Sequence, residues 1–220
     1  MLPRSDPGFE TAAAAPAPAV APGQSSESGT APQADPMRLA LYHHRAGDFE
    51  NALIHYRAVL QKDELNAAAH NNLGMLYQQK NLLDEAAREF QRAILIDPNY
   101  RLARNNYGVA LLGQGRTEAA AAEFRAVIAL DPRNVDAVVN LALAEKQGHQ
   151  PEKARATLLR ALGMSPGHAA AHYNLAVLHD AAGDFARAIE HYRAFLETAG
   201  ADDAGRAPVV RARIETLSGR

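Results

Sequence analysis

The chain has 220 residues, a formal net charge of −2 and no cysteine. The lack of cysteine excludes disulfides, thiolate catalysis and cysteine metal sites. Its 23 basic and 25 acidic residues nearly balance, so charge gives no reason to expect nucleic acid or an anionic membrane as a partner. No stretch approaches the roughly 20 consecutive apolar residues that a membrane-spanning helix needs.

Residues 1–34 are dominated by alanine, proline, serine and glycine. Such a segment buries too little apolar surface to offset the entropy of ordering it, so we predict a disordered tail that is a tether or a linker without a role. Prolines interrupt its apolar centre and Asp6 and Glu10 precede it, which argues against a signal peptide. We expect a cytoplasmic protein, with the periplasm as the alternative. The abundance of alanine and arginine is typical of GC-rich bacterial genomes.

Beyond the tail, the sequence repeats itself with a period of 34 residues. Five ungapped copies span residues 33–66, 67–100, 101–134, 135–168 and 169–202. A fixed period of this length predicts a stacked array of small units that bury their apolar faces against one another. We assign residues 35–202 to the array and residues 203–220 to a C-terminal capping helix.

Three positions of the copy indicate how each unit folds. The eighth is always small (Ala40, Gly74, Gly108, Ala142, Ala176), and the twentieth is always alanine (Ala52, Ala86, Ala120, Ala154, Ala188). The twenty-fourth is always large and apolar (Tyr56, Phe90, Phe124, Leu158, Tyr192). Small residues let the two helices of one copy approach closely, while the large residues are expected to fill the space between copies.

Capping and turn residues place the helices in chain order. Asp35-Pro36 begins the first, Gly47-Asp48 turns into the second, and Asp-Pro pairs follow later ones. The expected helices cover residues 36–45, 49–61, 67–79, 83–95, 101–112 and 117–129, and a further helix begins at Pro151. A last helix over 207–218 has Val210, Ile214 and Leu217 on one face, as a cap on the end of the array requires.

With small, alanine, aromatic and proline positions in phase, residues 33–202 are similar to the tetratricopeptide repeat proteins. The resemblance implies an all-α, right-handed α-solenoid in which each repeat has an A helix and a B helix, with the A helices lining a concave groove. It further implies a non-catalytic module that binds a peptide or protein segment there, as an adaptor or assembly factor of a larger complex. Two alternatives stay open: a homo-oligomeric structural scaffold, and the targeting subunit of an enzyme on another chain.

An asparagine at the sixth position of four repeats is the main candidate for a binding surface. The four residues are Asn72, Asn106, Asn140 and Asn174. Equal spacing places them on one face as a ladder, and an amide offers both a donor and an acceptor to a peptide backbone. The ladder resembles the one in O-GlcNAc transferases, although this chain has no glycosyltransferase domain. The alternative is that asparagine is simply frequent at this position of the family.

The second, fifth, ninth and twelfth positions are also expected to face the groove. The twelfth supplies His44 in repeat one and Asp180 in repeat five, and the main candidates are at the fifth and ninth. Those two positions supply Asn71, Met75, Asn105, Val109, Val139, Leu143 and Tyr173. This lining is apolar with interspersed amides, which suits an extended segment or a helix with apolar anchors. The alternative for each residue is packing between helices. The fifth position carries no lysine, which disfavours the basic clamp that binds chaperone tails in this family.

Signatures of enzymes are absent from the sequence: there is no phosphate-binding glycine loop, HExxH or nucleophile elbow, so we expect no catalytic residue and no cofactor. The chain has nine histidines, and six of them recur at equivalent repeat positions. They pair as His70 with His172, His55 with His191, and His43 with His179. This recurrence indicates packing positions, and no third ligand is spaced to complete a zinc site, so we expect no metal ion.

Overall fold

The computed structural model describes residues 35–203 and 205–219, so the tail predicted over 1–34 lies outside the described residues. The described part is all-α, with no strand. Its helices are α1 Pro36–Arg45, α2 Phe49–Lys62, α3 Ala67–Gln79, α4 Leu83–Ile96, α5 Arg101–Gly113, α6 Thr117–Leu130, α7 Val135–Gln147, α8 Pro151–Met164, α9 Ala169–Ala181, α10 Phe185–Thr198, the 3-10 turn η1 Ala201–Asp203, and α11 Ala207–Ser218.

Side-chain caps fix where several A helices begin. The Asp35 carboxylate accepts from the Met37 backbone N–H at 3.0 Å. Asn66 and Asn134 accept from the third backbone N–H of α3 and α7, each at 2.9 Å. Each cap satisfies a backbone donor that the first turn of a helix leaves free, so these residues set the start of the helices.

The turn from A helix to B helix always contains one residue in the left-handed backbone region. It is the fifteenth position of every repeat: Gly47 (φ 74°), Asn81 (58°), Gly115 (73°), His149 (58°) and Gly183 (79°). Glycine adopts this conformation at low cost, and asparagine and histidine adopt it more often than most other residues. The backbone geometry of the turn is therefore kept even in repeat four, where His149 stands at this position.

Within a repeat, the small eighth position lets the aromatic ring of the B helix reach the A helix backbone. A Cβ atom at Gly74 would lie 2.7 Å from the Phe90 ring, and one at Gly108 would lie 2.6 Å from the Phe124 ring. Both rings are fully buried. Each contributes about 1.5–3 kcal/mol through removal of apolar surface from water, so these contacts hold the helix pair together.

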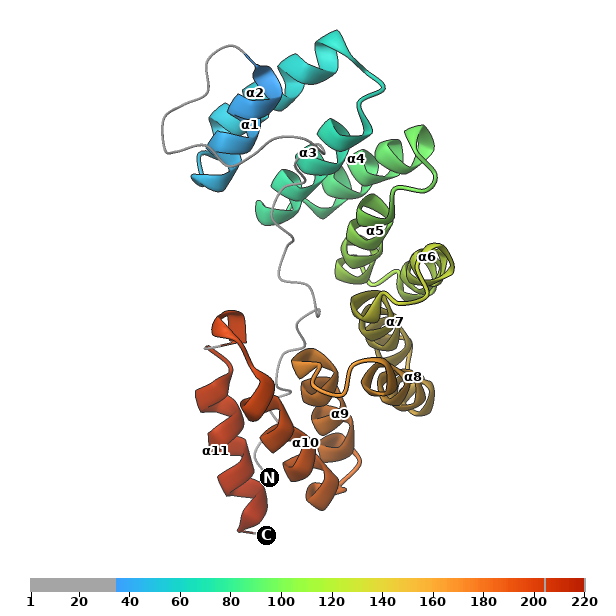
Figure 1. The fold of residues 1–220 in the computed structure, drawn as a ribbon, viewed down its shortest axis with the longest axis vertical. Coiled ribbons are helices and arrows are strands. Elements are labelled where there is room, and N and C mark those ends of the chain that lie inside the picture. Colours follow the sequence, from blue (N-terminus) through green and yellow to red (C-terminus); the bar gives the residue numbers. More distant parts are fainter. Residues whose placement is uncertain (1–34, 204, 220) are drawn as a thin grey trace.

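The five helix pairs stack into a curved α-solenoid, as the sequence predicts (Figure 1). Each A helix packs on the B helix of its own repeat and on the B helix of the preceding one. Figure 1 shows α3, α5 and α7 on the inner side of the curve and α4, α6 and α8 on the outer side. No helix among the described residues is long and apolar enough to cross a membrane.

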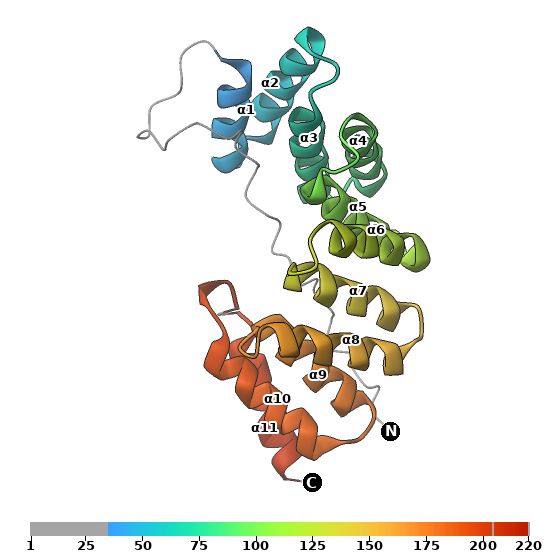
Figure 2. The same cartoon turned by 45° about the vertical axis from the view of Figure 1, so that its right-hand side comes forward.

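Helix α11 closes the C-terminal end of the array by packing along α10 (Figure 2). Val210 and Leu217 of α11 are buried in the apolar cluster of repeat five. Its Arg213 donates two hydrogen bonds, both of 2.7 Å, to the Asp180 carboxylate at the end of α9. Tyr192 of α10 donates to the same carboxylate at 3.3 Å. The cap is thus tied to both helices of the repeat that it covers.

Candidate functional site on the inner face of the array

The eleven predicted groove residues all lie on α3, α5, α7 and α9, the A helices of repeats two to five. All are buried in the full chain except Asn105 and Val109, which are half-buried. The A helices of neighbouring repeats contact one another directly, α3 with α5, α5 with α7 and α7 with α9. The structure therefore brings the predicted residues together along one series of helices.

The asparagines of neighbouring repeats are hydrogen-bonded to one another. The Nδ2 group of Asn106 donates to Oδ1 of Asn71 at 3.0 Å, and Nδ2 of Asn140 donates to Oδ1 of Asn105 at 3.0 Å. Each bond runs from a sixth position to the fifth position of the preceding repeat, a separation of 35 residues. The amide donors thus link adjacent A helices, a role that was not predicted although the 35-residue spacing is readable in the sequence.

Repeat five breaks this pattern because the fifth position of repeat four is Val139, which offers no amide. Asn174 instead donates from Nδ2 to the Ala170 carbonyl of its own helix at 2.8 Å. Its side chain therefore makes no hydrogen bond between repeats among those that the structure describes. Asn174 can therefore be altered without loss of a described hydrogen bond between repeats.

Two amide oxygens of the ladder are buried and lack a hydrogen-bond partner among the described residues: Oδ1 of Asn140 and Oδ1 of Asn174. An unpaired buried acceptor costs about 1–3 kcal/mol, so a ligand N–H that reached one of these oxygens would recover that energy. The apolar side chains of Val139, Leu143 and Tyr173 belong to the same two helices. All three are buried in apolar clusters of the core, as the alternative of packing between helices expects, so the two unpaired oxygens lie beside packed apolar side chains.

Two polar side chains at the twelfth position of the repeat, His44 and Asp180, are engaged within the protein. Asp180 binds α11, as described above. His44 lies 3.0 Å through Nδ1 from the Tyr56 hydroxyl and 2.9 Å through Nε2 from Gln79 Oε1. Burial lowers the pKa of His44, while the hydrogen bond with Gln79 opposes the shift. Both residues therefore have structural partners, and neither serves as a free contact for a ligand.

The fourth position of the repeat carries a second kind of link. In repeat three Arg104 donates to the Glu123 carboxylate and to the backbone carbonyl six residues earlier, both at 2.8 Å. In repeat two Nδ1 of His70 lies 2.6 Å from Oε2 of Glu89, and its Nε2 lies 3.1 Å from the corresponding carbonyl. We call this set of contacts the fourth-position link: the side chain at the fourth position joins the preceding loop to the twenty-third position of the repeat, which lies on the B helix.

In repeat five both side chains of the fourth-position link are histidines, His172 and His191. The recurring histidines of the sequence therefore have defined contacts within the array. Among the described residues, no group of three or more His, Cys, Asp or Glu side chains is arranged to hold a metal ion.

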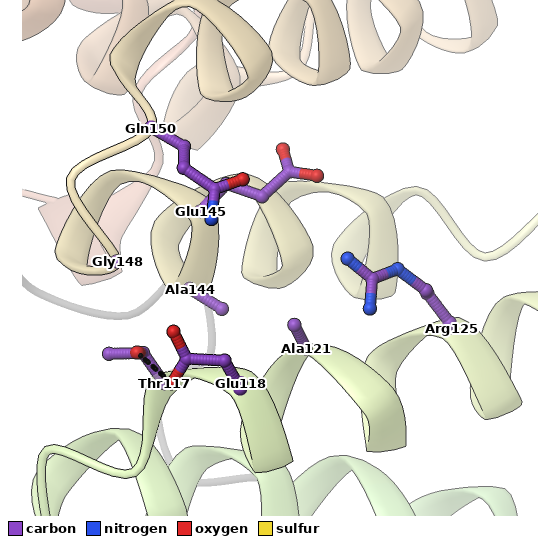
Figure 3. Close-up of a pocket in the computed structure, with 8 residues that line it drawn as sticks. All are labelled: Thr117, Glu118, Ala121, Arg125, Ala144, Glu145, Gly148 and Gln150. Atoms are coloured by element: carbon purple, nitrogen blue, oxygen red, sulfur yellow. Dashed lines mark hydrogen bonds between the residues drawn. The ribbon is translucent and has the colours of Figure 1, made fainter.

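A pocket lies where α6, α7 and the start of α8 meet (Figure 3). It encloses about 310 Å³, part of it open solvent, and Glu118, Glu145 and Arg125 supply its charged groups. Thr117 donates to Glu118 at 2.9 Å, and Thr157 donates to Glu145 at 2.7 Å. Both carboxylates thus have partners within the protein.

Comparison with known proteins gives a consistent picture. A family model described as tetratricopeptide repeat matches residues 37–101, 76–135 and 139–204, and a second of the same description matches residues 111–163. No curated protein matches the chain in sequence.

Three solved structures similar to this chain illustrate the fold. PilF of Pseudomonas aeruginosa aligns with a TM-score of 0.70 and 23% identity over 84% of this chain and 83% of that chain. PilW, a widely conserved type IV pilus biogenesis factor, gives 0.69 and 25% over 82% and 91%. YrrB, a repeat protein with an unusual peptide-binding site, gives 0.62 and 19% over 80% and 90%. At these identities the similarity shows the fold.

Proposed function

Because this chain belongs to the tetratricopeptide repeat family, a family of protein-interaction modules, we propose that it binds a segment of a partner protein along the inner face of its A helices. The partner segment would be held without chemical change, and the chain would act as an adaptor or assembly factor. The eleven residues predicted from the sequence are the proposed contact surface, and repeats four and five, at its C-terminal end, supply the unpaired acceptors.

The unpaired oxygens of Asn140 and Asn174 carry this proposal. A polypeptide backbone supplies N–H donors at regular spacing whatever its side chains are, so it suits acceptors that recur once per repeat. Apolar side chains of the segment would pack on the half-buried Val109, since Val139, Leu143 and Tyr173 are buried in the core. YrrB, a repeat protein of similar fold, has an unusual peptide-binding site, and this supports peptide binding by an array of this kind.

The proposal is tested with a peptide selected from a random library against the full chain, whose affinity is then measured by calorimetry. Asn174→Ala removes one acceptor and leaves the bonds between repeats intact, so we expect affinity to fall by about tenfold, since 1.4 kcal/mol corresponds to a factor of ten. The matched control is Asn99→Ala, an exposed loop position outside the A helices.

Equal affinity of the wild type and Asn174→Ala would refute the proposed surface, and so would an equal loss in the control. Light scattering on the same samples tests the alternative that the chain is a homo-oligomeric structural scaffold. A mass that rises with concentration, together with no selectable peptide, would favour self-assembly over peptide binding.

A further inference from the structure

The fourth-position link of repeat five has a different chemistry from those of repeats two and three. Nε2 of His172 lies 2.8 Å from the Pro166 carbonyl, and its Nδ1 lies 3.1 Å from Nδ1 of His191. A carbonyl only accepts, so Nε2 of His172 carries the hydrogen and its Nδ1 accepts from His191 when both rings are neutral. The pair can take up one extra proton on Nε2 of His191 and keep this bond, but a second proton, on Nδ1 of His172, would leave N–H facing N–H.

A third imidazole lies against this pair. The ring of His179 stacks on His191 with a centroid distance of 5.7 Å, and the rings of His172 and His191 are 5.4 Å apart. Nδ1 of His179 lies 3.3 Å from the Asp184 carboxylate, and Glu190 adds a second negative charge near His191. The pKa of His191 is lowered, first by burial and then by positive charge on the other two rings.

The elements packed around these three rings bring few further negative charges close to them. Helix α8 packs on α9 through apolar residues. On the α11 side, the Asp180 carboxylate is already bound to Arg213. In the preceding loop, His168 lies 3.0 Å from Asp136 of α7. Protonation of all three rings would therefore place more positive charge between α9 and α10 than their carboxylates can neutralise.

We propose that the histidine cluster of His172, His179 and His191 makes the C-terminal end of the array pH-sensitive, so that acidification loosens α10 and the α11 cap while the middle repeats stay folded. Histidine changes charge between about pH 5 and pH 8, which sets the range of the response. In repeat three the equivalent link is Arg104 with Glu123, whose charges persist at pH 5. In repeat two His70 lies 2.6 Å from the Glu89 carboxylate, whereas His172 faces another imidazole in its place. Acid sensitivity of this link is therefore confined to repeat five. The inference does not rest on the proposed peptide binding.

The test is hydrogen–deuterium exchange of the full chain at about pH 7.5 and about pH 5, corrected for the intrinsic pH dependence of exchange. We expect the protection of α10 and α11 to fall by roughly tenfold or more at the lower pH, while α5 and α6 keep theirs. The double variant His172→Arg, His191→Glu copies the link of repeat three and should abolish the fall. His191→Gln, which removes the titrating ring without adding a charge, should reduce it and serves if the double variant does not fold.

Unchanged protection of α10 and α11 in the wild type between the two pH values would overturn the inference. An equal loss of protection in the wild type and both variants would overturn it as well, because the sensitivity would then lie outside the cluster. Loss that began in α5 and α6 would likewise contradict a response confined to repeat five.

Discussion

Replacing one asparagine of a pair that bridges two repeats should lower the free energy of unfolding by more than the loss of a small side chain alone would. Asn106 is 3% exposed and donates to Asn71 at 3.0 Å. Asn71→Ala leaves that buried donor without its acceptor, which costs about 1–3 kcal/mol, and Asn106→Ala leaves the acceptor without its donor. The double variant loses the same bond only once. Its loss of unfolding free energy should therefore be smaller than the sum of the losses in the two single variants, by about 1–2 kcal/mol.

The assay is urea unfolding followed by far-UV circular dichroism for the wild type, both single variants and the double variant. If the slope of the unfolding free energy against urea concentration is the same in all four proteins, the differences between their unfolding midpoints report differences in stability. The control cycle pairs Asn71 with Asn140, two repeats apart and not bonded to each other, and should be additive within about 0.5 kcal/mol. If the Asn71–Asn106 cycle is as additive as the control, the asparagines do not link the repeats and this account of their donors is wrong.

Three further predictions concern stability. Phe124→Ala empties a fully buried site and should lower the free energy of unfolding by about 3–5 kcal/mol, whereas Leu95→Ala, at a side chain 76% exposed, should change it by less than about 0.5 kcal/mol in the same urea titration. Asp180→Ala removes the acceptor that holds α11, so hydrogen exchange of α11 should speed up by about tenfold, and unchanged exchange would contradict the role of this carboxylate. Burial lowers the pKa of His44 and His191, so below about pH 6.5 the unfolded chain binds more protons than the folded chain. Stability should therefore fall as the pH drops from about 7 to about 5, and a constant free energy of unfolding across that range would show the sign to be wrong.

The period of the sequence was enough to predict the helices and their stacking, because each repeat buries the same positions. The expected starts at Pro36, Ala67 and Arg101 are those of α1, α3 and α5, and several B helices extend one residue beyond the expected end. The left-handed residue of each turn was harder to see, since Asn81 and His149 stand where the other repeats have glycine.

The partners of individual side chains could not be predicted from the period. The bonds from Asn106 and Asn140 depend on how far one A helix is shifted along the next, and that shift is a property of the superhelix. The same holds for Arg213, which reaches Asp180 across 33 residues of chain. The sequence located the candidate surface on the A helices, but it did not show that the amide donors are used internally while two acceptors lack partners.

The central claim, that a partner segment lies along the inner face of the A helices, is tested most directly by the footprint of a bound peptide. Hydrogen–deuterium exchange of the full chain with and without a saturating selected peptide would map it. We predict slower exchange in α7 and α9, with α5 beside them, and no change in α4, α6 and α8 on the outer side of the curve. Protection concentrated in the outer helices or in α11, with the A helices unchanged, would contradict the account.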